Sequence, residues 1–104
     1  MNGTEYLIVK LMEEAAEVQQ RASKLLQFGP AEIQAGHDKS NVERLRYEVN
    51  DLLAVITLLE MVKTLPRVSA DELRNHIVAK SDKMLQFLAY SKALGCVSDG
   101  PTQP

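Results

Sequence analysis

The chain has 104 residues and a net charge of −2, with 45% hydrophobic and 25% charged residues, a composition typical of one small globular domain and not of a disordered chain. Nothing in this slightly acidic balance points to nucleic acid or an anionic membrane as a partner. The most apolar run, residues 52–59, is too short to span a membrane. The single cysteine, Cys96, excludes an internal disulfide and a cysteine-based zinc site. Residues 1–5 lack the features of a signal peptide, so we expect a cytoplasmic protein.

Residues 4–28 have the spacing of an amphipathic helix, because apolar side chains recur every three or four residues on one face. Thr4 is the expected N-cap. Gly29 and Pro30 should end the helix, since glycine tolerates a left-handed cap and proline cannot continue the hydrogen-bond ladder. The apolar stripe consists of Ile8, Leu11, Ala15, Val18, Ala22 and Leu25.

A second helix is expected over residues 42–65, after a loop over residues 29–40 with one short helical turn near residues 31–35. Asn41 is its expected N-cap. Pro66 should stop the helix because proline lacks the backbone N–H that the helix needs.

This second helix is apolar around most of its circumference, since only Thr57 and Glu60 interrupt the apolar residues from Leu52 to Val62. A helix of that kind in so small a protein needs cover from several sides. Self-association supplies the cover most simply. We therefore expect a homodimer or a homotetramer.

A third helix is expected from a capping box at residues 69–72 to about Leu94, with Gly95 as its C-cap. We find no strand pattern and no internal repeat. The sequence therefore predicts an all-α fold, an antiparallel helical bundle completed by oligomerisation. The domain should span residues 1–96, followed by a flexible tail over residues 97–104.

Two pairs of acidic residues border the apolar stripes of the first two helices. Glu14 and Glu17 are three residues apart, as are Glu48 and Asp51, so each pair shares one helix face. Both pairs face the region where helices pack, and four carboxylates there would repel one another unless a cation compensates. Mg²⁺, with Mn²⁺ as the alternative ion, prefers oxygen ligands and retains waters that a substrate phosphate can replace.

Ordinary surface charge is the alternative explanation for these glutamates. Glu14 stands at helix spacing from Lys10, and Glu17 from Arg21, so each could form an ion pair. The pattern alone does not decide between a metal site and such pairs. A carboxylate-bridged di-iron bundle is disfavoured because the ExxH motif is missing.

The two acidic motifs resemble those of a known superfamily. Residues 13–18 (EEAAEV) and residues 48–55 (EVNDLLAV) are similar to the ExxE and ExxD motifs of the MazG-like nucleotide pyrophosphohydrolases. The resemblance covers roughly residues 5–96. Further likeness to small single-domain members from phages and bacteria lies at residues 22–24, 28–29, 41, 80–84, 87–91 and 95.

The resemblance implies Mg²⁺-dependent cleavage of (d)NTPs between the α and β phosphates, which gives a (d)NMP and pyrophosphate. It also implies that Glu14, Glu17, Glu48 and Asp51 are the metal ligands and that the helices assemble as a dimer or a tetramer. The chain departs from the family pattern in two ways. The interval between Glu17 and Glu48 is longer than is common, and there is no tryptophan to stack on a base.

Cationic and aromatic residues are candidates for binding the nucleotide. Lys24 flanks the first motif, while Lys80 and Lys83 share one face of the third helix, and lysines often bind phosphate as point charges. Ordinary solvated charge is the alternative for each lysine. Phe28 and Tyr90 could stack on a base, although core packing is the favoured interpretation for Phe28.

Other functions stay open at this point. A relative could hydrolyse another phosphoanhydride, such as phosphoribosyl-ATP or an alarmone. The chain could instead be a non-catalytic helical binding or oligomerisation module whose acidic face meets a partner. A regulatory or toxin–antitoxin module is a weaker alternative, because no basic patch or recognition helix is present. The preferred base, the sugar and the carboxylate that acts as general base are not specified by the sequence.

Overall fold

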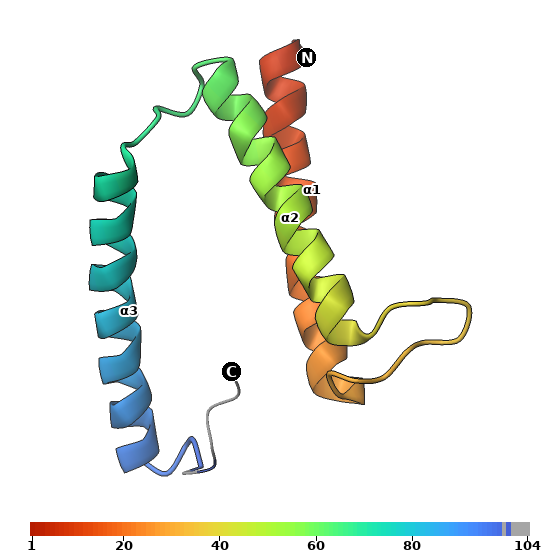
Figure 1. Cartoon of the computed structure of the whole chain (residues 1–104), viewed down its shortest axis with the longest axis vertical. Coiled ribbons are helices and arrows are strands. Elements are labelled where there is room, and N and C mark those ends of the chain that lie inside the picture. Colours follow the sequence, from red (N-terminus) through yellow and green to blue (C-terminus); the bar gives the residue numbers. More distant parts are fainter. Residues whose placement is uncertain (99, 101–104) are drawn as a thin grey trace. The chain divides into compact units, whose positions relative to one another are not determined.

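The computed structural model of the chain describes residues 1–98 and residue 100, and the predicted all-α class is confirmed over them. The predicted flexible tail, residues 97–104, falls largely on residues 99 and 101–104, which lie outside the described residues. The helices, in chain order, are α1 (Gly3–Phe28), α2 (Asn41–Met61) and α3 (Ala70–Ala93) (Figure 1).

The start of α1 is a capping box that lies before the predicted cap. The Asn2 side chain accepts a hydrogen bond of 2.9 Å from the Glu5 amide, and the Glu5 carboxylate accepts one of 3.1 Å from the Asn2 amide. This reciprocal pair satisfies two backbone donors that a helix start leaves free, so the prediction of Thr4 as N-cap was wrong. The predicted end is confirmed, because Gly29 has φ 90° and its amide donates to the Leu25 carbonyl.

The bounds of α2 differ from the prediction at both ends. Ser40, and not Asn41, is the N-cap, and its hydroxyl and backbone form a capping box with Glu43. The helix ends at Met61, before Pro66 is reached. The chain leaves the helical conformation at Lys63, whose φ of 62° is left-handed, a conformation that is uncommon for a residue with a side chain.

The start of α3 agrees with the sequence. Ser69 is the N-cap, and its hydroxyl accepts a hydrogen bond of 3.0 Å from the Glu72 amide, which is one of the two bonds of the predicted capping box. At the other end Gly95 has φ 79° and its amide donates to the Lys92 carbonyl. The C-cap of α3 is Leu94, one residue before the predicted Gly95, and Gly95 follows the cap in a left-handed conformation.

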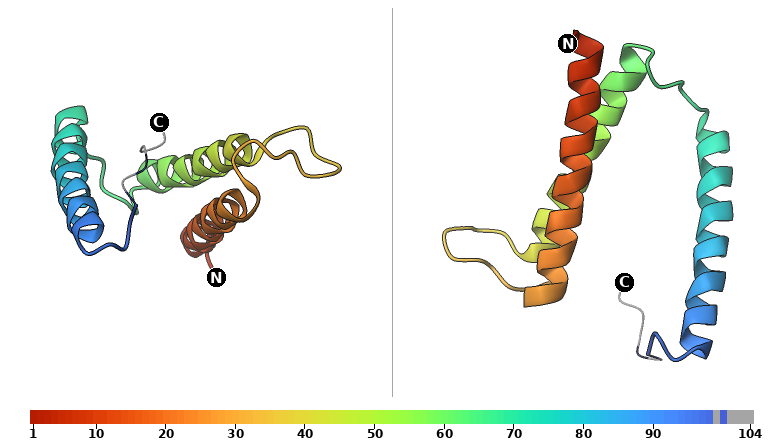
Figure 2. Two further views of the ribbon diagram at one scale, coloured as in Figure 1. Left: turned by 90° about the horizontal axis from the view of Figure 1, so that it is seen from below. Right: turned by 180° about the vertical axis from the view of Figure 1, so that it is seen from behind.

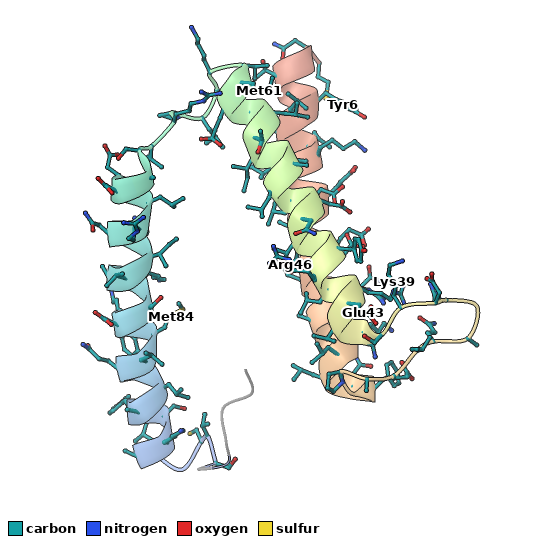
Figure 3. The ribbon with its side chains drawn as sticks, in the orientation of Figure 1. Tyr6, Lys39, Glu43, Arg46, Met61 and Met84 are labelled. Carbon is teal, nitrogen blue, oxygen red and sulfur yellow. The ribbon has the colours of Figure 1, made fainter. Side chains whose placement is uncertain are left out.

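The chain divides into two compact units, Met1–Arg67 and a second that begins at Val68. In the first unit α1 and α2 pack side by side and run antiparallel, as both views in Figure 2 show. Tyr6 of α1 and Met61 of α2 lie at one end of this hairpin, and Glu43 lies at the other (Figure 3). The hairpin is therefore the structural frame for the acidic motifs, since both motifs lie within it.

The core of the hairpin is small. Leu59, 1% exposed, and Val55, 9% exposed, are the only buried apolar residues in the described part of the chain. The predicted stripe of α1 is half-buried from Leu11 to Leu25, whereas Ile8 is 40% exposed. Apolar side chains of α2 also remain on the surface, among them Leu53, Leu58 and Met61, as does that of the C-cap residue Val62.

The surface of α3 carries apolar side chains along the whole helix, and none of its residues is buried. Charged residues interrupt the apolar ones on this helix. None of the helices within the described chain is both long and apolar enough to cross a bilayer. The exposed large apolar side chains of α3 are Leu73, Ile77, Val78, Met84, Leu85, Phe87 and Tyr90.

The loop over residues 29–40 is held to the start of α2 by one buried side chain. Asn41, 2% exposed, donates through Nδ2 to the Gly29 carbonyl (2.8 Å) and to Oε1 of Glu32 (3.1 Å). Residues 31–35 form turns and an isolated bridge and not the predicted helical turn. The long interval between the acidic motifs is thus accommodated outside the packed helices (Figure 1).

Candidate metal centre

Three carboxylates gather where the two helices of the hairpin meet. Glu14 of α1 and Glu48 and Asp51 of α2 each offer an oxygen atom, and these oxygens all lie within 4.8 Å of one another. Glu14 and Glu48 are half-buried, and Asp51 is exposed. The structure therefore brings together three of the four acidic residues that the sequence singled out.

The register of the helices explains this convergence. Glu14 directly precedes Ala15 of the α1 stripe, and Glu48 directly precedes Val49 of α2; both apolar neighbours are half-buried. Asp51 lies one turn before the buried Val55. When the apolar stripes pack against each other, they draw the adjacent carboxylates to the boundary between the helices.

The pKa of Glu48 reflects the closeness of the other carboxylates. Partial burial raises the pKa of the Glu48 carboxyl above its ordinary value of 4.5, and the negative charges of Glu17, Asp51 and Glu14 raise this pKa further. The positive charge of Arg21 acts in the opposite direction. A group that is both desolvated and surrounded by like charges is stabilised by a nearby cation.

Glu17 lies one turn further along α1, and its side chain is exposed. It is not one of the three residues whose oxygens converge. Its charge is nevertheless the largest charge effect that raises the pKa of Glu48, so the two carboxylates are close enough to interact. Its role as a fourth ligand stays a prediction.

The three converging residues fit a hard divalent ion. Two ligand atoms on opposite sides of Mg²⁺ lie about 4.2 Å apart, because each bond is about 2.1 Å long. Separations of up to 4.8 Å therefore need only small side-chain movements to reach that geometry. The donors are all carboxylate oxygens, which suit Mg²⁺, Mn²⁺ or Ca²⁺ better than the softer metals that histidine and cysteine select.

The ion pair of Lys10 is relevant to the alternative that the glutamates are ordinary surface charges paired with basic residues of the same helix. Lys10 binds Glu13, with an Nζ to Oε2 distance of 2.9 Å, and this bond raises the pKa of Lys10. The pair suggested between Lys10 and Glu14 is therefore wrong for this structure. Glu14 is left with the other two carboxylates as its charged neighbours in the cluster.

Arg21, which helix spacing offers as an ion-pair partner for Glu17, is a buried cation beside the cluster. It is 8% exposed, and its Nη1 atom is buried with no hydrogen-bond partner among the described residues. The sequence does carry a signal for its burial. Arg21 follows Glu14 by two helical turns and lies between Val18 and Leu25, so it shares the face that packs against α2.

Lys24 and Phe28 interact with each other near the end of α1. The Lys24 Nζ lies 5.6 Å from the centroid of the Phe28 ring, within range of a cation–π interaction. Phe28 is 53% exposed, so the interpretation of this ring as a core residue was wrong. Both side chains stay candidates for contact with a nucleotide.

The other predicted nucleotide contacts belong to the second unit. Lys80 and Lys83 share one face of α3 and, with His76 and Ala79, line a shallow hollow of about 220 Å³. Tyr90 is 63% exposed. Their roles as substrate contacts stay predictions.

A larger hollow lies elsewhere in the hairpin unit. It has a volume of about 420 Å³, lies at the end of α2, and is lined by none of the predicted site residues. Glu60 and Leu65 are its half-buried lining residues, and the others are exposed. We therefore place the candidate chemistry at the carboxylates, where charge and burial are combined.

Comparisons with protein-family models, with curated proteins and with solved structures found no match. The MazG-like resemblance therefore depends on the motifs in the sequence.

Proposed function

We propose that this protein is a Mg²⁺-dependent nucleotide pyrophosphohydrolase of the MazG-like type, which converts a (d)NTP to a (d)NMP and pyrophosphate. The observation that carries the proposal is the convergence of Glu14, Glu48 and Asp51 from two helices. An isolated ExxE motif on a helix is common. Two acidic motifs whose oxygens meet in space are a more specific arrangement.

The carboxylates have distinct roles in this proposal. Glu14, Glu48 and Asp51 hold the ion, which when bound neutralises phosphate charge and makes the phosphorus more susceptible to attack. Glu17 either completes the ligand set, as the resemblance implies, or orients the attacking water and accepts its proton. Its exposure and its proximity to Glu48 suit either role.

The substrate needs positive charge in addition to the ion, because four carboxylates repel a triphosphate. Lys24, Lys80 and Lys83 are the proposed phosphate contacts. Phe28 and Tyr90 are the proposed stacking surfaces for the base. Both rings are more than half exposed and thus free to contact a ligand.

The apolar surface supports a homodimer or homotetramer as the functional form. A hairpin that buries only Val55 and Leu59 among its apolar residues has a very small core for a stable domain. Leu53 and Leu58 are 50% and 44% exposed on α2, and α3 is exposed along its length. Packing between copies would bury these side chains.

Product analysis tests the proposal. Purified protein is incubated with Mg²⁺ and a panel of NTPs and dNTPs, and the products are separated by chromatography. We expect monophosphate and pyrophosphate from the wild type, and none from Glu48→Gln or in EDTA. Glu13→Gln is the matched control, because Glu13 is on the same helix as Glu14 but pairs with Lys10. Release of diphosphate and orthophosphate would refute the proposed cleavage position.

The same panel separates the alternatives. Phosphoribosyl-ATP and alarmones are included, and turnover of these alone would assign the chain to a related phosphoanhydride hydrolase. The exposed apolar side chains also favour a second candidate, a non-catalytic helical oligomerisation module. Folded protein that hydrolyses no nucleotide and does not bind Mg²⁺ would support that function.

A further inference from the structure

The burial of Arg21 requires an explanation that the proposed reaction does not give. Its side chain is more than nine-tenths buried, and Nη1 is sealed from solvent and has no hydrogen-bond partner in the described chain. A buried donor without a partner normally destabilises a fold. A buried charge is more costly still unless other charges compensate.

The acidic residues near Arg21 are the candidates for that compensation. Arg21 lies one turn from Glu17 and two turns from Glu14 on the same side of α1. Across the helix boundary, its charge also acts on Glu48. Arg21 is thus a buried cation next to a cluster with excess negative charge.

Direct binding of substrate by Nη1 is a poor explanation, because this atom is sealed from solvent. A phosphate could reach it only if the packing between α1 and α2 opened. An effect of the charge through space requires no such opening, because Coulomb interactions between partly buried groups extend over several ångströms.

We propose that Arg21 is the counter-cation of the acidic cluster, because its guanidinium offsets the carboxylate charge when no ion is bound. The first effect of this charge is to stabilise the packing of α1 on α2. The second effect is to lower the affinity of the cluster for a divalent cation. The first effect is independent of the proposed function. The second rests on the proposed metal site. Arg21 is therefore a positioning residue, which acts through Glu48 and its neighbours and touches no substrate.

A double-mutant cycle in EDTA tests the first effect. Arg21→Met removes the charge and keeps an unbranched apolar side chain, and Glu48→Gln removes a partner charge. We expect Arg21→Met to raise the unfolding equilibrium constant about 3- to 10-fold more in the wild-type background than in the Glu48→Gln background. Arg21→Lys, which keeps the charge, should change the unfolding equilibrium constant by nearly the same factor in both backgrounds. Equal effects of Arg21→Met in both backgrounds, or loss of folding in both, would show a packing role and overturn the proposal.

Mg²⁺ titration by calorimetry tests the second effect. Loss of one positive charge near the site should strengthen Mg²⁺ binding by about 3- to 10-fold in Arg21→Met, as expected for a partly screened interaction over several ångströms. Arg21→Lys should bind Mg²⁺ as the wild type does. Weaker binding in Arg21→Met would overturn the second effect. If folded wild-type protein binds no Mg²⁺, the proposed metal site fails, while the cycle in EDTA still decides whether Arg21 is the counter-cation.

Discussion

Glu14 and Glu48 come from different helices, and yet they offer carboxylate oxygens within 4.8 Å of each other at the boundary of α1 and α2. Both side chains are half-buried, so their mutual repulsion is less screened than it would be on an open surface. A bound cation would relieve this repulsion. This relationship makes the two residues the most informative positions for mutation.

Removal of either carboxylate should weaken Mg²⁺ binding. We expect Glu48→Gln and Glu14→Gln each to lower the affinity at least about 10- to 100-fold, since even the loss of an outer partner of a metal ligand costs that much. Calorimetric titration measures the change. Glu13→Gln should bind as the wild type does, and an equal loss in this control would show that the cluster holds no specific site.

Glu17→Gln separates the two roles proposed for that residue. If Glu17 is a ligand, the substitution should weaken Mg²⁺ binding about as much as Glu48→Gln does. If Glu17 orients the attacking water, Mg²⁺ binding should change little, while kcat falls about 100-fold or more, the usual contribution of a general base. Unchanged affinity and unchanged kcat would exclude both roles.

The stability of the folded protein should depend on pH in part through Glu48. Its pKa is raised in the folded protein, so the folded state binds more protons than the unfolded state between the ordinary value of 4.5 and the raised one. Without metal, Glu48 should therefore lower stability as the pH rises from that ordinary value through the raised pKa. Thermal unfolding in EDTA should show this decline in the wild type and a flatter profile in Glu48→Gln.

Glu43 provides the control of opposite sign. The Ser40 amide and hydroxyl lower the pKa of Glu43 below 4.5, so its stabilising effect is present above that value and is lost as the pH falls through the lowered pKa. Glu43→Gln should therefore flatten the acid side of the profile. A Glu43→Gln profile that matches that of Glu48→Gln would contradict both assignments.

Asn41 should contribute substantially to stability through the loop. Asn41→Ala leaves the Gly29 carbonyl and the Glu32 side chain without their Nδ2 donor, which we expect to cost about 1–3 kcal/mol. Denaturant unfolding measures this loss. Asn50→Ala, which replaces an exposed asparagine on the same helix, should change stability by less than about 0.5 kcal/mol.

The fold was predictable from the sequence where one local signal dominated. Apolar spacing indicated all three helices, and Gly29 and Ser69 marked boundaries that the structure confirms, whereas Gly95 follows the observed C-cap, Leu94, by one residue. The N-caps of the first two helices were missed because two suitable residues stood close together in each case. At Ser40 and Asn41, the choice depended on burial of the Asn41 side chain against the loop, which is a tertiary effect.

The candidate site was predictable to a similar degree. Helix spacing paired Glu48 with Asp51 on one face, but only the packing of α1 on α2 showed that Glu14 joins them. The burial of Arg21 was missed because its charge is typical of a surface residue, although its register is that of the apolar stripe. The nucleotide contacts on α3 depend on how the chain assembles, and local spacing carries no information about that.

The self-association of the chain is the last prediction, and it follows from the size of the core. Leu59 is 1% exposed, so Leu59→Ala should cost about 2–5 kcal/mol of stability, a large share for a domain with so few buried side chains. Because so few apolar side chains are buried, we expect the exposed Leu53 to be covered by another copy. Sedimentation should therefore give two or four times the chain mass of 11.6 kDa.

Leu53→Glu should shift the protein toward the monomer and lower its thermal stability, because a charge would then enter an apolar contact. Gln19→Glu is the matched control, since it adds the same charge at an exposed polar position of α1. A wild type that sediments as a stable monomer would show that the hairpin and α3 need no second copy. A dimer or tetramer that tolerates Leu53→Glu would place the contact on other apolar side chains, those of α3 first.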